Sequence, residues 1–105
     1  MPFDVAVFDW RAGERRVEDA PPQERPALER VVDAIVAELR RRIGISFTVD
    51  ELAGLYDQGT DWGLDVAQRV EPDSPWAWDA GLVDAAFHRF LREATDFAGG
   101  RRLLG

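Results

Sequence analysis

The side chains that support acid–base or nucleophilic catalysis are scarce in this sequence. It has no cysteine, its only histidine is His88, and its two serines are Ser46 and Ser74. Asp84 and Arg92 lie four residues before and after His88, so a helix would align the three side chains on its exposed side. A nucleophile with an adjacent base is very hard to build from this set. The sequence therefore predicts no catalytic residue and a protein that is not an enzyme.

Carboxylates are frequent between residues 61 and 79 and raise the question of a metal site. They are Asp61, Asp65, Glu71, Asp73 and Asp79. Their spacing does not match the calcium-binding loop of helix–loop–helix proteins. Asp61 and Asp65 are one helical turn apart, where two solvated carboxylates near a helix start are the simpler interpretation. We expect no metal and no cofactor.

The same stretch, "DWGLDVAQRVEPDSPWAWDAG" (61–81), contains three of the four tryptophans. Tryptophan is enriched at the energetic centres of protein interfaces, and its ring attracts arginine and lysine. A partly exposed ring among carboxylates suits a partner protein with a basic surface. The predicted partner-binding residues are Asp61, Trp62, Asp65, Asp73, Trp76 and Trp78. The alternative is that the tryptophans fill a structural corner between two helices.

Two other functions fit parts of this stretch. One is a small-molecule site in an aromatic cleft between Tyr56, Trp62 and Trp78. The other is a DNA-binding helix-turn-helix with residues 61–70 as the recognition helix, which would present acidic side chains to phosphates. The leading hypothesis is a non-enzymatic protein–protein interaction or regulatory module. Its partner is an unknown protein, or a second copy of this chain that pairs through an N-terminal strand.

The charge is unevenly distributed along the chain. The net charge is −7, and residues 45–84 carry nine acidic residues against a single arginine. Nucleic-acid binding is expected to leave a basic stripe, so this field disfavours DNA and RNA as partners. An acidic surface can steer a basic protein partner. It can also be a solvated face that only maintains solubility.

Composition and length place the chain among small globular domains. Its 105 residues allow one domain, and 46% hydrophobic with 31% charged residues is an ordinary globular composition. No stretch resembles a signal peptide or a membrane span, so we expect a soluble, cytoplasmic protein. All 13 basic residues are arginine, which indicates a GC-rich coding sequence and a high-GC bacterium as the source.

The strongest helical pattern runs from residue 26 to residue 43. Its apolar residues recur every three or four positions: Leu28, Val31, Val32, Ile35, Leu39 and Ile43. Pro26 suits the first turn and Gly44 the position after the last. The basic run 40–42 suits the dipole of the last turn, which explains it without an anion site.

Three further helices are predicted after Gly44. Thr48 and Glu51 have the capping-box spacing that starts a helix over 47–59, with Gly59 as its end. A second helix covers 60–70, and a last helix begins at Ser74–Pro75 or at Asp79 and has the widest apolar face.

The N-terminal segment predicts a different structure. "FDVAVFDW" (3–10) is β-branched and aromatic, with Gly13 as a turn, which favours a hairpin over 1–20. Residues 21–26 contain three prolines and predict a linker, and 99–105 a frayed tail. The predicted fold is mostly α: one compact four-helix domain, with its helical core at 27–98 and an N-terminal β-hairpin or extended arm.

Overall fold

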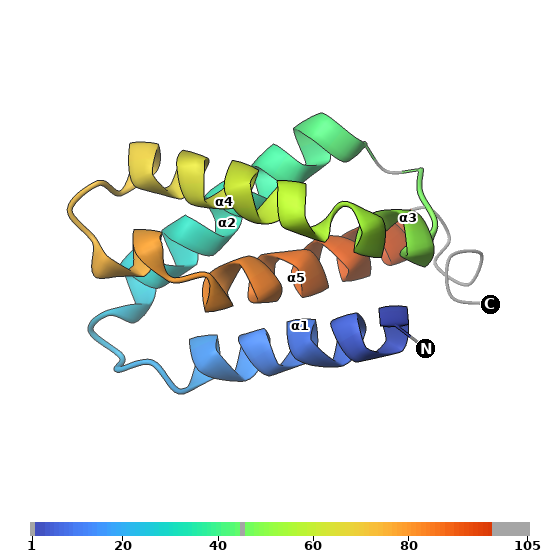
Figure 1. Cartoon of the computed structure of the whole chain (residues 1–105). Coiled ribbons are helices and arrows are strands. Elements are labelled where there is room, and N and C mark those ends of the chain that lie inside the picture. Colours follow the sequence, from blue (N-terminus) through green and yellow to red (C-terminus); the bar gives the residue numbers. More distant parts are fainter. Residues whose placement is uncertain (1, 45, 98–105) are drawn as a thin grey trace.

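A computed structural model describes residues 2–44 and 46–97, and every regular element in those ranges is helical. The elements are α1 (Pro2–Glu18), α2 (Arg25–Ile43), α3 (Val49–Gly54), α4 (Tyr56–Val70), the 3-10 helix η1 (Pro75–Trp78) and α5 (Gly81–Phe97). The main helices are α1, α2, α4 and α5 (Figure 1). The mostly α prediction is confirmed. Across the described ranges, no helix combines the length and the apolar character needed to cross a membrane.

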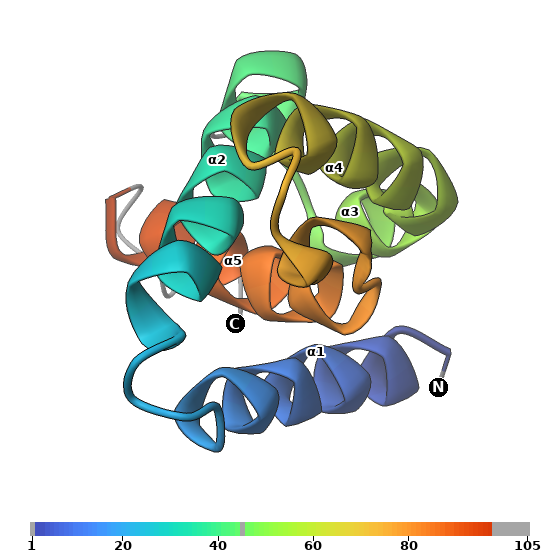
Figure 2. The same cartoon turned by 90° about the vertical axis from the view of Figure 1, so that its left-hand side faces the viewer.

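Helix α5 lies at the centre of the fold, as its wide apolar face predicts. Helix α1 packs along one side of α5, while α2 and α4 cover the other side (Figure 2). Over residues 81–93, where its burial is described, α5 buries Leu82, Val83, Ala85, Ala86, Phe87, Phe90 and Leu91. The radius of gyration is 13.1 Å, which is close to the ~13 Å of a compact domain of this length.

The predicted N-terminal β-hairpin or extended arm is wrong, because residues 2–18 form α1. Trp10, Gly13, Val17 and Ala20 are all buried, and their spacing of three and four residues marks one side of a helix. The β-branched and aromatic residues of 3–10 favour a strand only weakly. Packing of the buried side of α1, described from Trp10 on, outweighs that propensity.

Helix α2 confirms the pattern predicted for residues 26–43. Pro26 lies in its first turn, and Gly44 follows its last residue with a φ of 81°, a backbone conformation that glycine adopts readily. The apolar stripe is buried at Leu28, Val31, Val32, Ile35 and Leu39. The proline-containing linker is short, and two of its turns are closed by bonds from Glu24 N to Pro21 O and from Arg25 N to Pro22 O.

The capping box that starts α3 is confirmed. Thr48 N donates to Glu51 Oε1 at 2.8 Å, and Glu51 N donates to Thr48 Oγ1 at 3.1 Å. The predicted end at Gly59 is wrong, because α3 stops at Gly54 and Gly59 lies inside α4. A Cβ atom on Gly59 would lie 2.3 Å from Cζ of Phe87. This glycine therefore permits close helix packing and does not end a helix.

Ser74 and Asp79, the two caps predicted for the last helix, start two different elements, η1 and α5. The Ser74 hydroxyl accepts a bond from Trp76 N at 3.2 Å and starts η1. Asp79 Oδ1 accepts a bond from Gly81 N at 2.9 Å, where α5 begins. Residues 71–80 thus form a corner between α4 and α5. The predicted tail, 99–105, lies outside the described residues.

Candidate functional site

The six predicted partner-binding residues lie in two places. Asp61, Trp62 and Asp65 lie along α4, whereas Asp73, Trp76 and Trp78 lie in the corner that joins α4 to α5. This corner, residues 71–80, sits at the end of the bundle where α1 stops and α2 starts (Figures 1 and 2).

Trp78 is the most exposed large apolar residue among those whose burial the structure describes, residues 10–44, 46–48 and 50–93. It is 66% exposed, and the other large apolar residue on the exposed side is Val70, at 48%. The 3-10 helix explains why the two tryptophans of the corner differ. With three residues per turn, positions two apart point in different directions. Trp78 therefore faces solvent, while Trp76 turns toward the bundle and is half-buried.

Trp76 has a structural partner. Its Nε1–H donates to Glu24 Oε1 at 3.1 Å, which connects η1 to the start of α2. Ala77, between the two tryptophans, is fully buried. The alternative that the tryptophans fill a structural corner thus describes Trp76 but not Trp78.

Two carboxylates of the corner are also held by arginines. Arg16 Nε and Nη2 both donate to Asp79 Oδ2, at 2.7 and 2.5 Å, and join α1 to the corner. Arg30 Nε donates to Glu71 Oε1 and joins α2 to it. Asp73 is exposed and has no ion pair with any described residue. The free negative charge of the corner is therefore that of Asp73.

The outer side of α4 carries a row of carboxylates. Asp57, Asp61 and Asp65 follow at four-residue steps and are all exposed, so they line one side of the helix. Asp65 pairs with Arg69, whose Nη2 donates to Asp65 Oδ2 at 2.8 Å. Asp57 and Asp61 have no ion pair within the described residues, so this side of α4 carries a net negative charge.

Trp62 lies beneath an arginine from α2. The guanidinium carbon of Arg42 is 4.8 Å from the centre of the Trp62 ring, a cation–π distance. Arg42 in turn donates to Glu38 Oε2 at 2.6 Å, and Arg41 Nη2 donates to the same oxygen at 2.7 Å. The hydrogen bonds from Arg41 and Arg42 lower the pKa of Glu38 to about 2, against the effect of its burial.

The triple arginine is therefore engaged within the protein. Arg40 bonds to Glu93 of α5, while Arg41 and Arg42 bond to Glu38. These pairs supplement the dipole interaction predicted for the last turn of α2. The ring of Trp62 is already covered by the guanidinium of Arg42 from the same chain.

The predicted small-molecule cleft draws on three rings that the structure places in different surroundings. The Tyr56 ring centre is 5.3 Å from that of Phe87 and 6.2 Å from that of Trp10, and its hydroxyl donates to Asp84. Trp62 is covered by Arg42, and Trp78 faces solvent. A site between these three side chains remains a prediction.

The predicted helix-turn-helix corresponds to α3 and α4. Only Leu55 separates the two helices, and α3 has six residues. The side of α4 that faces solvent is the acidic row at 57, 61 and 65. DNA phosphates would be repelled by that side.

The prediction that His88 lies on a solvated side of its helix is wrong, because α1 covers it. The imidazole is only 15% exposed, and its Nδ1 is 3.5 Å from Oε1 of Glu14 on α1. Both atoms are buried without a hydrogen-bond partner within the described residues. The row with Asp84 and Arg92 therefore does not form an exposed triplet, since Asp84 bonds to Tyr56.

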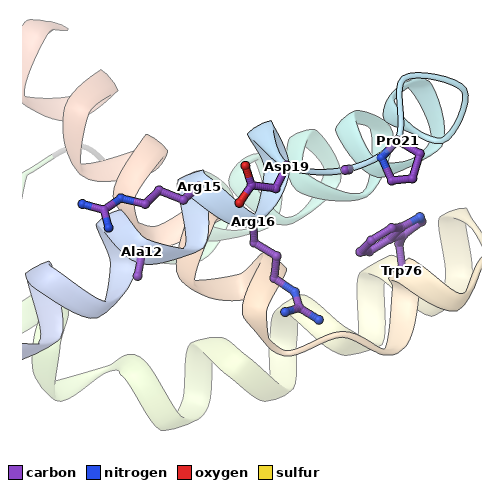
Figure 3. Close-up of a pocket in the computed structure, with 7 residues that line it drawn as sticks. Ala12, Arg15, Arg16, Asp19, Pro21 and Trp76 are labelled. Carbon is purple, nitrogen blue, oxygen red and sulfur yellow. The ribbon is translucent and has the colours of Figure 1, made fainter.

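A hollow that sequence reasoning missed lies beside the corner. Its volume is about 450 Å³, and its lining comes from the end of α1, the linker and η1 (Figure 3). The lining residues are Ala12, Arg15, Arg16, Asp19, Ala20, Pro21 and Trp76. Four of them, at 12, 15, 16 and 19, have the spacing of one helix side. The hairpin predicted over residues 1–20 did not place these four positions on one side of a helix.

Within the described ranges, no three His, Asp or Glu side chains converge in a way that could hold a metal ion. No protein-family model, curated protein or solved structure matches this chain.

Proposed function

We propose that the protein is a non-enzymatic interaction module that binds a partner protein through the surface centred on Trp78. The carrying observation is the 66% exposure of this indole. Trp78 is held at a rigid corner, since Asp79 is fixed by Arg16 and Trp76 by Glu24. A large ring presented from a fixed backbone loses little conformational entropy on binding, which is why tryptophan is frequent among interface hot spots.

The charge around Trp78 supports a partner with a basic surface. Asp73 lies in the same corner, and Asp57, Asp61 and Asp65 form an exposed acidic row on α4, the helix that leads into this corner. Arginine and lysine side chains can pair with these carboxylates and stack on the exposed ring. Long-range attraction of this kind mainly raises the association rate.

The structure makes a sharper test possible than replacement of both corner tryptophans. Trp76 supports the fold, so the variant is Trp78→Ala alone, compared with Arg11→Ala, which truncates a long exposed side chain on α1. Affinity capture from native lysate is expected to recover a partner with the wild type and with Arg11→Ala, and to lose it with Trp78→Ala. Equal recovery by all three proteins would show that Trp78 is not the contact.

A second measurement tests the charge. With the purified partner, Asp61→Asn/Asp65→Asn/Asp73→Asn should slow association several-fold and reduce its salt dependence. Glu18→Gln, on α1, removes an exposed carboxylate elsewhere and should leave the association rate unchanged. An association rate that the triple variant does not change would rule out an acidic contact surface.

A further inference from the structure

Two helices on opposite sides of the bundle carry exposed rows of charge with the same spacing. The α1 charge row has two cations followed by an anion, and the α4 charge row has two anions followed by a cation. The first row consists of Arg11, Arg15 and Asp19, and the second of Asp61, Asp65 and Arg69. All six residues are exposed, and steps of four residues place each row along one side of its helix. Position by position, the charges of the two rows are opposite.

The α1 charge row keeps its helical spacing to the end, although α1 stops at Glu18. The backbone N–H of Asp19 donates to the carbonyl oxygen of Arg15 at 2.9 Å, which is the four-residue bond of an α-helix. Figure 3 shows the Arg15 side chain extended away from Trp76 and apart from Arg16. No residue of this row forms an ion pair with another residue whose side chain the structure describes. The two cations and the anion are therefore available for contact with another molecule.

The α4 charge row is only partly neutralised within the chain. Arg69 Nη2 donates to Asp65 through Oδ2 alone, at 2.8 Å. Both side chains are more than 60% exposed, and an exposed pair of this kind contributes little free energy. A guanidinium has five N–H donors, so Arg69 retains donors for a second carboxylate. The row can thus accept two cations at Asp61 and Asp65 and one anion at Arg69.

One copy of the chain cannot pair its own two rows, because α5 lies between α1 and α4 (Figure 2). Both helices run in the same general direction, from the end of the bundle at α3 toward the corner at 71–80 (Figures 1 and 2). A second copy displaced across the bundle without rotation would therefore lay its α1 parallel to α4 of the first. The order of the charges matches in this parallel arrangement. An antiparallel approach would instead bring Arg11 to Arg69 and Asp19 to Asp61.

We propose that the protein associates with a second copy of itself, with the α1 charge row of one copy on the α4 charge row of the next. The pairs are Arg11 with Asp61, Arg15 with Asp65, and Asp19 with Arg69. Because the two surfaces differ, the contact is heterologous and can repeat into an open chain of copies. The net charge of −7 opposes association, but its repulsion is largely screened beyond about 10 Å at 0.1 M salt. Complementary charges in contact also fix the register of the two helices.

This association shares the α4 carboxylates with the proposed partner surface but does not use Trp78. Trp78→Ala should therefore leave self-association unchanged, whereas it is expected to abolish capture of the partner protein. Each proposal can thus fail without the other. Loss of self-association in Trp78→Ala would place the contact at the corner and overturn the pairing of the two rows.

Two charge reversals test the two surfaces separately. Arg15→Asp disables the α1 charge row and leaves the α4 charge row intact, and Asp61→Arg does the reverse. Sedimentation velocity of the whole protein, up to millimolar concentration in about 0.1 M salt, is expected to show concentration-dependent association of the wild type. Each variant alone should associate at least roughly tenfold more weakly, because one pair becomes a like-charge contact. Arg92→Asp makes the same charge change at an exposed position of α5, outside both rows, and should associate like the wild type.

Mixing the variants tests the head-to-tail geometry. An equimolar mixture of Arg15→Asp and Asp61→Arg should form a dimer of one copy of each and nothing larger, since only one combination of rows remains fully complementary. The double variant Arg15→Asp/Asp65→Arg exchanges the charges of one pair and should recover association, with circular dichroism to confirm that all variants fold. A wild type that stays monomeric at every concentration overturns the proposal. So does a mixture without dimers, or a loss in Arg15→Asp that Arg92→Asp reproduces.

Discussion

Single residues at the α1–α5 contact show how closely the two helices approach. Gly13 lies in the middle of α1, where glycine is unfavourable for a helix. A Cβ atom there would lie 2.5 Å from Ala85 N and 2.9 Å from Gly81 O, both backbone atoms of α5. Backbone atoms of a helix cannot move to relieve a steric clash, whereas the flexible end of a side chain can. The absence of a side chain at Gly13 is therefore what lets α1 lie directly on α5.

Replacing this glycine tests the contact. Gly13→Ala should destabilise the protein by ~1–3 kcal/mol or more, because the methyl group overpacks the helix contact. Gly54→Ala is the matched control, since a Cβ there meets nothing within 4 Å, and it should be neutral or stabilise by up to ~1 kcal/mol. Urea unfolding followed by circular dichroism measures both. Equal stability of the two variants would contradict the close approach of α1.

At the scale of elements, the helices with local signals were predictable. The periodic apolar residues and Gly44 marked α2, and Thr48 with Glu51 marked the start of α3. Helix α1 was not predictable in the same way. Its type depends on burial against α5, more than sixty residues away in the sequence, which no local pattern reports.

At the candidate site, too, local sequence patterns do not report contacts with distant residues. Trp76 and Trp78 point in different directions because η1 is a helical turn, which the sequence spacing did not decide. Which of the two faces solvent depends on Glu24, the partner of Trp76 across 52 positions. The hollow needed α1 to be recognised as a helix first. The sequence therefore identified the corner, but the direction of its side chains came from contacts between distant elements.

The most buried and the most exposed tryptophan, Trp10 and Trp78, provide a test of the packing of α1 on the core. Trp10 is 1% exposed, with its ring centre 5.1 Å from that of Phe87, and it joins α1 to the core. Trp10→Ala should cost ~3–5 kcal/mol, as large core truncations do. Trp78→Ala should stay within ~0.5 kcal/mol of wild type, as surface changes do. Thermal and urea unfolding compare them, and similar losses would mean that α1 does not bury Trp10.

At the scale of the whole molecule, arginines connect the helices across the surface. Arg89 of α5 forms ion pairs with acidic residues of two other helices, α1 and α2. Its Nη1 donates to Glu29 of α2 at 3.0 Å, and its Nη2 donates to Glu14 of α1 at 3.4 Å. Partial burial would lower the pKa of Arg89, but the bonds to Glu29 and Glu14 raise it above the ordinary value. Arg89 therefore remains a cation that holds α1, α2 and α5 together.

Removing this cation should loosen the whole assembly. Arg89→Met keeps most of the apolar stem but leaves Glu14, only 16% exposed, without its arginine. We expect a loss of ~2 kcal/mol, less than the roughly 3–5 kcal/mol of a fully buried pair. Arg69→Met breaks the exposed pair with Asp65, both side chains being more than 60% exposed, and should cost at most ~0.5 kcal/mol. Urea unfolding compares the two.

The origin of that loss can be separated by a double-mutant cycle. If the cost of Arg89→Met is the uncompensated charge of Glu14, then Glu14→Gln should recover ~1 kcal/mol in the Arg89→Met background. The same substitution in wild type should destabilise, because it weakens the bond to Arg89 and the approach to His88. Additive losses would show that Arg89 stabilises through its contacts with α2 alone. If Glu14→Gln stabilises the Arg89→Met variant but destabilises the wild type, the ion pair between Glu14 and Arg89 is what holds α1 on the bundle.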